Sequence, residues 1–235
     1  MPFLHYIVFV LFFQGLFCAS IFKKGENSIM ADFLVIAVKI LAVLFSIVLH
    51  EVAHGAMAFS LGDNTAKNLG RLTLNPIKHL DFFGSFLLPV MLYVLSRGAF
   101  VFGYAKPVPY EPANLRDRKY GPAKVAAAGP LTNIAVAILF GLILRLFSGF
   151  ISSPQFVEIL QFVVFMNLVL AVFNLMPIPP LDGYWLVLTF VPNRYWQFKE
   201  AYLRFGFVIL ILFLFYGFVL IMPIVSWLFI LFTGL

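Results

Sequence analysis

Two histidines and a glutamate stand in the pattern H-E-x-x-H at His50, Glu51 and His54. Residues four apart on an α-helix share one face, so both imidazoles can bind one metal ion. Glu51, one step around the helix, flanks that face and can act as a general base on a metal-bound water. The pattern therefore predicts a zinc site that performs hydrolysis.

The sequence around this pattern is that of a membrane helix. Residues 33–61 form an apolar stretch long enough to cross a bilayer, and after Lys39 it has no ionisable group before His50. Ionisable side chains in hydrocarbon are costly and are seldom placed there without a partner or a task. An incidental pair of histidines fits such a stretch poorly, so we interpret the pattern as a metal site within the membrane.

The site needs a third protein ligand, because catalytic zinc usually takes three and leaves the fourth position for water. Asp182 is a candidate: it follows a proline-rich interruption, residues 177–180, between two hydrophobic segments. Prolines remove helical hydrogen bonds and can leave an unwound stretch that turns a carboxylate toward a metal. The alternative is an ordinary loop carboxylate beside the turn residue Gly183.

Composition identifies the class of protein. Of the 235 residues, 63% are hydrophobic and 11% are charged, which excludes a water-soluble domain. The net charge of +6 comes from short loops between apolar segments, so we expect contacts with lipid headgroups and no nucleic-acid binding. The single cysteine, Cys18, excludes an intrachain disulfide framework, and the bulky residues before it do not suit a lipoprotein anchor.

We expect an all-α polytopic membrane protein, a helical bundle of about 4–6 transmembrane helices with a re-entrant hairpin region. The whole chain, residues 1–235, is expected to form one membrane-embedded domain, with a catalytic core at 32–183 and C-terminal helices at 184–235. Residues 1–30 are either an extra N-terminal helix or an extension upstream of a start at Met30. The long apolar segments are residues 32–61, 123–147, 155–176 and 205–235.

The fourth of these segments contains Pro223 and is either one kinked span or a tight hairpin. If Asp182 meets the histidines, the first and third segments run in the same direction and the second runs the opposite way. The apolar run 82–96 then cannot be a lone crossing. We expect it to pair with 100–104 as a re-entrant hairpin, shielded by protein or lining a wet cavity.

Basic residues predict the orientation in the membrane. Nine lysines and arginines lie between the end of the first long segment and Lys124, at the start of the second, and three more follow Asp182. By the positive-inside rule, the active-site side faces the cytoplasm, and we expect a bacterial cell membrane. Arg145 and the pair Lys23-Lys24 are exceptions on the outer side.

Three ordered motifs resemble the site-2 protease family of intramembrane zinc metalloproteases. They are H-E-x-x-H at 50–54, A-G-P at 128–130 and N-x-x-P-x-x-x-L-D-G at 174–183. H-E-x-x-H alone occurs in many unrelated proteases, whereas the ordered set is specific to this family. The chain resembles a small bacterial-type member without a soluble regulatory domain.

The resemblance implies that His50, His54 and Asp182 bind one Zn²⁺ ion per chain and that Glu51 is the catalytic glutamate. It also matches Asn174 to an asparagine that steadies the substrate or the developing oxyanion. An amide there can donate to an oxyanion without adding charge. A hydrogen bond between helices is the other role for such a residue.

By this resemblance the chain is a zinc metalloendopeptidase that cuts peptide bonds within or near transmembrane segments. Its expected substrates are membrane-anchored proteins or signal-peptide remnants in the lipid bilayer, and a second copy or a regulatory membrane protein is a further candidate partner. The alternative is a metal-binding scaffold or a divalent-metal transporter, but a transporter would be expected to repeat polar ligands in symmetric halves.

Four further features receive structural interpretations. We expect Asn133 to hydrogen-bond between helices and Gly129-Pro130 to serve close packing or a kink. We expect His79 to be solvated or at headgroup level, and a gating or substrate-contacting role is its alternative. The hydrophobic insertion 82–104 is a candidate substrate gate.

Overall fold

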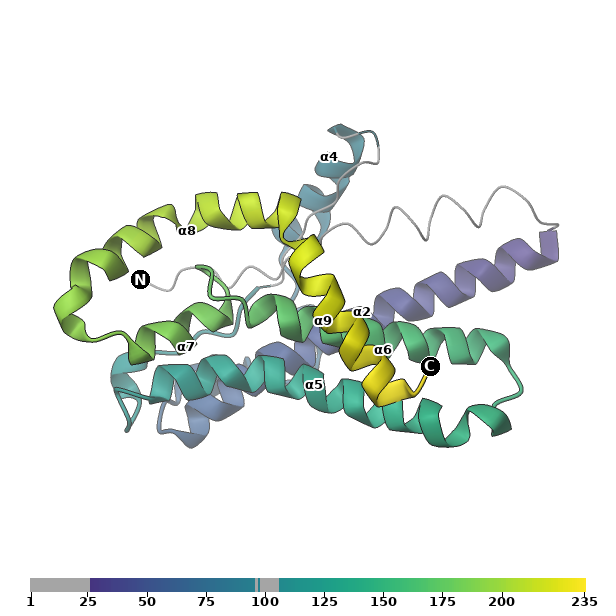
Figure 1. The fold of residues 1–235 in the computed structure, drawn as a ribbon, viewed down its shortest axis with the longest axis horizontal. Helices are drawn as coiled ribbons and strands as arrows, with labels where there is room; N and C mark the ends of the chain where they lie inside the picture. The colour runs from purple at the N-terminus through teal and green to yellow at the C-terminus, as the bar shows by residue number, and fades with distance from the viewer. Residues whose placement is uncertain (1–25, 96, 98–105) are drawn as a thin grey trace.

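The computed structural model describes residues 26–95, 97 and 106–235, and all regular elements within them are helices (Figure 1). This confirms the all-α prediction. The candidate first helix with Cys18 and the second arm of the expected hairpin, 100–104, lie outside the described residues. In chain order the helices are α2 (Glu26–Ser60), α3 (Thr65–Asn68), η1 (Pro76–Lys78), η2 (Phe82–Leu87), α4 (Leu88–Leu95), η3 (Pro112–Asn114), α5 (Gly121–Phe147), η4 (Ser148–Phe150), α6 (Pro154–Asn174), α7 (Asp182–Phe190), η5 (Asn193–Tyr195), α8 (Trp196–Tyr216) and α9 (Phe218–Thr233).

Helix α2 carries the H-E-x-x-H pattern near its C-terminal end and begins six residues earlier than predicted. It ends at Ser60, and the turn that follows contains Gly62, where the backbone φ angle is +108°. The Gly62 N–H donates to the Phe59 carbonyl at 3.1 Å and the Asp63 N–H to the Ala58 carbonyl at 2.9 Å. These two bonds form a Schellman motif, which needs glycine at the left-handed position.

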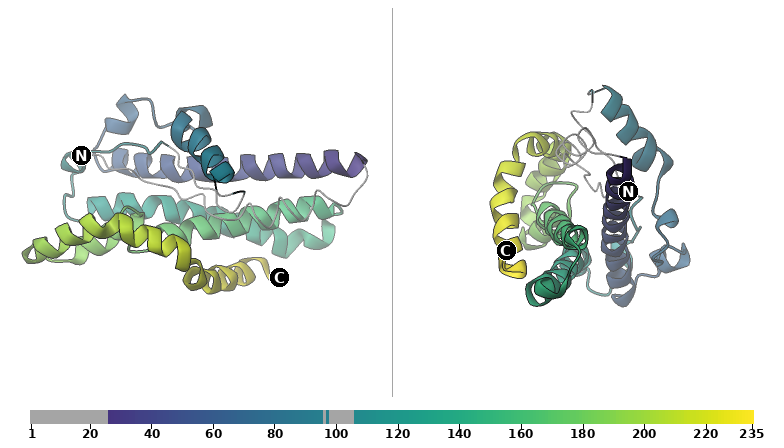
Figure 2. Two further views of the ribbon diagram at one scale, coloured as in Figure 1. Left: turned by 90° about the horizontal axis from the view of Figure 1, so that it is seen from above. Right: turned by 90° about the vertical axis from the view of Figure 1, so that its right-hand side faces the viewer.

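Helices α5 and α6 form a bundle with α2, and their bounds agree with the predicted segments to within two residues. Figures 1 and 2 show that α2 and α6 run in the same direction while α5 runs the opposite way, as predicted. The Ser153 hydroxyl caps α6 by accepting the Phe156 N–H at 3.3 Å. The parallel arrangement brings the chain after α6 to the level of the H-E-x-x-H pattern.

The C-terminal tract is helical from Trp196 and is broken at Gly217, where its two halves, α8 and α9, are bent by 67°. Pro223 lies inside α9 and does not end it. Helix α9 packs on α5 and α6, and this contact contains buried apolar side chains such as Leu144 and Val225. The Arg145 guanidinium donates to the Leu231 carbonyl at 2.8 Å, so the C-terminal end of α9 compensates this cation.

Three of the described helices, α2, α5 and α6, are long and apolar enough to cross a membrane, or four spans if the bent pair counts as one. The chain is therefore a multi-pass integral membrane protein. The run 82–95 is shorter and is divided into a π-helix, η2, and α4. No side chain of α4 is buried, and α4 projects away from the bundle (Figures 1 and 2). This arrangement agrees with the expectation that it is not a lone crossing.

Candidate metal centre

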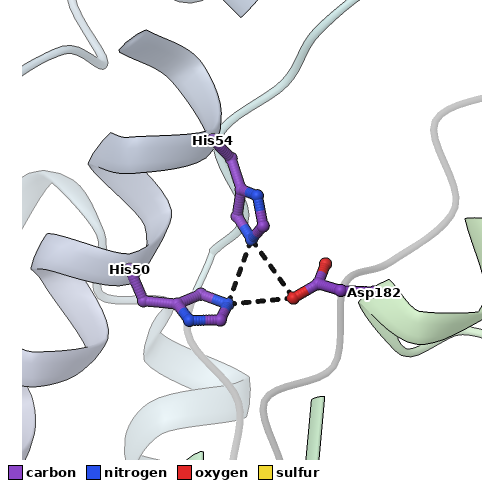
Figure 3. A group of neighbouring side chains, drawn as sticks. All are labelled: His50, His54 and Asp182. Carbon is purple, nitrogen blue, oxygen red and sulfur yellow. Dashed lines mark hydrogen bonds and ion pairs between the residues drawn. The ribbon is translucent and has the colours of Figure 1, made fainter. Parts of the chain in front are cut away.

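His50, His54 and Asp182 point toward one another in the interior of the bundle (Figure 3). The two histidine Nε2 atoms are 3.0 Å apart, and Asp182 Oδ2 lies 3.1 Å from His50 Nε2 and 3.4 Å from His54 Nε2. Ligand atoms at ordinary zinc distances in a tetrahedral site are about 3.3 Å apart. The three side chains, each at most 4% exposed, therefore fit a zinc ion.

Separate elements deliver these side chains. The histidines lie on one face of α2, as their spacing requires, and Asp182 is the first residue of α7. The chain from Leu175 to Leu181 connects α6 to α7 without a regular helix. Its proline-rich sequence explains this interruption, because proline lacks the N–H that continues a helix. The predicted unwound stretch before the aspartate is confirmed.

The Nδ1 atom of each histidine faces an oxygen, which leaves both Nε2 atoms for a metal. His54 Nδ1 lies 2.7 Å from the Val125 carbonyl oxygen, and His50 Nδ1 lies 2.5 Å from Asn133 Oδ1. A carbonyl oxygen only accepts hydrogen bonds, so each Nδ1 carries the proton. Such partners fix the tautomer and the ring orientation of metal-binding histidines.

Gly129 forms the wall of the site opposite the histidines. A Cβ atom at this position would lie 2.4 Å from His54 Nε2 and 2.6 Å from His50 Nε2, closer than any real contact. The missing side chain thus leaves open the space where the ligand atoms converge. The sequence suggested packing or a kink for Gly129, and the structure adds that α5 needs glycine here to leave room for an ion.

Glu51 lies beside the cluster and is 1% exposed. Its Oε2 accepts the Val108 N–H at 2.9 Å, whereas Oε1 is buried and has no hydrogen-bond partner among the described residues. A buried carboxylate oxygen without a hydrogen-bond partner costs free energy, and such an oxygen can accept a hydrogen bond from a water molecule. Glu51 Oε1 is therefore placed to accept a hydrogen bond or a proton.

Arg71 positions the loop segment that contacts Glu51. Its guanidinium donates to the carbonyl oxygens of Lys78 at 2.5 Å and of Lys106 at 2.7 Å. Burial lowers the pKa of Arg71, and the negative charge of Glu51 partly offsets that effect. Arginine remains charged throughout the physiological range, so this side chain ties two loops together and adds positive charge near the glutamate.

Asn174 and Asn133 were both expected to have polar roles in the membrane. Asn174 ends α6, is buried, and donates from Nδ2 to the Leu170 carbonyl of its own helix at 2.9 Å. Asn133 donates to Asn167 Oδ1 at 2.9 Å, which is the predicted hydrogen bond between helices. Its contact with His50 was missed, since sequence spacing carries no sign of it.

His79 is not solvated, contrary to the prediction. It is completely buried, and its Nε2 lies 2.8 Å from the Thr73 carbonyl oxygen. Its backbone carbonyl accepts the Lys106 N–H at 2.8 Å. The surrounding loops fold over this residue, which the polar local sequence could not indicate.

Comparisons with known proteins agree with this site. The sequence model of peptidase family M50 matches residues 147–213, which include Asp182. "Putative zinc metalloprotease YwhC" of Bacillus subtilis is 36% identical over 159 residues, which cover 65% of this chain and 68% of that protein. The chain belongs to peptidase family M50. The M50 assignment confirms the resemblance to site-2 proteases, and the protein is a zinc metalloprotease embedded in the membrane.

Other relatives are similar over much of the chain. "Putative zinc metalloprotease MJ0611" of Methanocaldococcus jannaschii is 32% identical over 168 residues, covering 70% of this chain and 74% of that protein. "Putative zinc metalloprotease Rip2" of Mycolicibacterium smegmatis is 33% identical over 141 residues, covering 60% of this chain. The match spans about half of Rip2, 52% of its length. No solved structure matches the chain significantly.

Proposed function

We propose that this metalloprotease hydrolyses peptide bonds within or near the transmembrane segments of membrane-anchored substrates. In this proposal His50, His54 and Asp182 hold one zinc ion, and Glu51 is the general base. The observation that carries it is the meeting of these three buried ligand atoms inside a membrane bundle. The proposed catalytic core, residues 32–183, contains all of them.

The depth of the site supports a substrate within the membrane. His50 lies ten residues before the end of α2, or about 15 Å at 1.5 Å per residue. A peptide bond at that depth belongs to a membrane segment or to its immediate flank. Such a segment must unwind to expose its backbone, so we expect cleavage near residues with weak helix propensity.

Each residue of the site has a defined task in this mechanism. Zinc, when bound, polarises a peptide carbonyl and lowers the pKa of a bound water. Glu51 accepts the proton of the attacking water at Oε1 and passes it to the leaving amine, while Val108 holds Oε2 in place. We assign Asn174 a supporting role toward the substrate or the oxyanion, because it is buried at the end of α6, close in sequence to Asp182.

A substitution of Glu51 by Gln tests the function. The purified wild-type and Glu51→Gln proteins, in proteoliposomes with a membrane-anchored reporter, should bind equal zinc by elemental analysis. Cleavage by the variant should fall at least about 100-fold, because general-base catalysis is lost. Equal cleavage by both proteins would remove the mechanism. Zinc flux into the vesicles without any cleavage by the wild type would support the transporter alternative instead.

We also propose that the active-site end faces the cytoplasm of a bacterial cell. The basic residues after α2 and after α7 support this orientation, and two of the three relatives named above are bacterial. In a variant without Cys18, a cysteine at Lys67 should resist a membrane-impermeant thiol reagent applied to intact cells. A cysteine at Ser152, on the opposite connection, should react. The reverse pattern would invert the topology.

A further inference from the structure

A buried chain of hydrogen bonds leads from Ser46 to His50 through two asparagines. Asn167 Nδ2 donates to Ser46 Oγ at 2.9 Å, Asn133 Nδ2 donates to Asn167 Oδ1 at 2.9 Å, and Asn133 Oδ1 lies 2.5 Å from His50 Nδ1. All four residues are at most 4% exposed. These hydrogen bonds join α2, α5 and α6 at the level of the metal centre.

The direction of every amide in this chain is determined by a backbone carbonyl. Asn167 Nδ2 also donates to the Val163 carbonyl at 2.9 Å, and Asn133 Nδ2 lies 3.4 Å from the Ser46 carbonyl. The Ser46 hydroxyl donates to the Ala42 carbonyl at 2.9 Å, which leaves its oxygen to accept from Asn167. Carbonyl oxygens only accept, so each amino group must face its carbonyl and each Oδ1 must face onward.

We propose that Asn133 and Asn167 are positioning residues for the metal centre. Together they hold His50 with its proton on Nδ1 and its Nε2 toward Asp182, ready to bind a metal. A flipped Asn133 would turn its amino group toward His50 Nδ1, and that amino group cannot accept a proton. Asn167 prevents this flip without touching the histidine. The inference rests on the proposed metal-binding role of His50.

The two histidines differ in how this orientation is achieved. His54 Nδ1 donates to the Val125 carbonyl, a backbone group that no side-chain substitution removes. His50 depends on a side chain that is itself held by a second helix. Partners that orient ligands in this way typically change metal affinity by about 10–100-fold when removed. A purely structural role, with the amides joining helices, would change stability but not metal affinity.

The experiment compares zinc affinity and protein stability across matched variants. The full-length protein in detergent is titrated with zinc against a chelator for wild type, Asn133→Leu, Asn133→Asp and Asn167→Leu. Val164→Ala is the control, because Val164 is completely buried on α6 near Asn167 but makes no side-chain hydrogen bond. Thermal midpoints identify variants that only lose packing.

Asn133→Leu should bind zinc at least about 10-fold more weakly than wild type, and Asn167→Leu should show a smaller loss in the same direction. Asn133→Asp keeps an oxygen for His50 and should stay closer to wild type than Asn133→Leu. The Val164→Ala control should keep full affinity. Equal zinc affinity in Asn133→Leu and wild type would overturn the inference.

Spectra of the metal-free protein labelled with ¹⁵N-histidine give a second readout that does not depend on activity. Wild-type His50 should show the Nδ1-protonated tautomer, whereas Asn133→Leu should show a mixture; an unchanged tautomer would count against the inference. A His50→Ala variant separates the two hypotheses. If it binds zinc as tightly as wild type, the proposed metal site fails, whatever the asparagines do.

Discussion

The two ends of the contact between α2 and α6 show how differently a membrane bundle can treat charge. At the end near Ser60, His50, His54 and Asp182 are buried, and both imidazoles have partners on α5. At the other end, Lys39 Nζ lies 2.5 Å from Glu158 Oε1, and the glutamate side chain is 55% exposed.

Burial and the number of partners distinguish these two ends. A half-exposed ion pair is a single contact that water or lipid headgroups can replace, so it contributes little to stability. Removing one member of a buried set of interacting ionisable side chains is expensive, because the remaining members lose a partner that water cannot replace. Substitutions at the end near Ser60 should therefore cost more than substitutions at the Lys39 end.

Among substitutions at either end, removal of Asp182 should have the largest effect on zinc binding. Asp182→Ala deletes one of the three proposed ligands, so bound zinc should fall from about one ion per chain to a small fraction, and cleavage should be lost. Elemental analysis after gel filtration measures the metal. Asp117→Ala, which removes a carboxylate paired with exposed Lys124, is the matched control and should keep its zinc. Full zinc occupancy in Asp182→Ala would exclude this ligand.

An added methyl group on α5 tests whether the space at the histidines is needed. Gly129→Ala should weaken zinc binding by at least about 100-fold, because the new Cβ overlaps both Nε2 atoms. Gly141→Ala is the control on the same helix: its Cβ would meet the Phe232 Cβ at 2.8 Å, far from the metal centre. The control should lose stability but retain zinc affinity. Similar zinc affinity in both variants would refute the steric argument.

Asp63 shows how the loop beyond α2 supports the end near Ser60. Its carboxylate accepts hydrogen bonds from Thr65, Asn114 and the Glu111 N–H. Asp63→Asn replaces one acceptor by a donor and should lower the free energy of unfolding by about 1–3 kcal/mol. Denaturant titration in detergent measures this loss. A smaller change than in Asp117→Asn, a control whose carboxylate is less buried, would contradict it.

The same carboxylate makes stability depend on pH. Burial raises the pKa of Asp63, but the hydrogen bonds outweigh it, so the folded-state pKa lies below the ordinary value. The stabilisation is therefore complete above the unfolded pKa of about 4 and is lost as pH falls through the folded pKa. Unfolding midpoints between pH 3 and 6 should converge for wild type and Asp63→Asn at the acid end. If the difference in unfolding midpoint between the two proteins stayed constant over this pH range, Asp63 would not cause the pH dependence.

The smallest effects are expected at the Lys39 end. Lys39→Met leaves the exposed Glu158 without a partner and should cost at most about 1 kcal/mol. Glu158→Gln leaves a buried ammonium whose remaining contact is the Phe162 ring at 5.3 Å, so it should cost more. Unfolding in detergent measures both, and neither should change zinc affinity. If Lys39→Met lost more stability than Glu158→Gln, the argument that the lysine is the buried member of the pair would be wrong.

The sequence predicted the parts of the molecule that follow local rules. Hydropathy identified α2, α5 and α6 because a membrane helix must be continuously apolar, and the spacing of His50 and His54 identified one helix face. Asp182 followed from the need for a third ligand and from the prolines before it. The direction of each helix then followed from bringing these residues together.

The remaining features depend on contacts between distant segments. The burial of His79 results from loops that fold over it, and the open space at Gly129 exists only once α5 lies against α2. The break in the C-terminal tract occurs at Gly217 although Pro223 was the stronger sequence signal. Pro223 is the sixth residue of α9, where its missing N–H removes one helical hydrogen bond without ending the helix.

The placement of Asp182 after α6 has a consequence for biosynthesis. A nascent chain that has inserted α2 and α5 already displays both imidazoles but lacks the carboxylate that closes the cluster. The zinc-binding geometry can therefore form only after the third long helix has entered the bilayer and the following turn has left the ribosome. A copy whose synthesis stops before Asp182 would lack one of the three proposed zinc ligands.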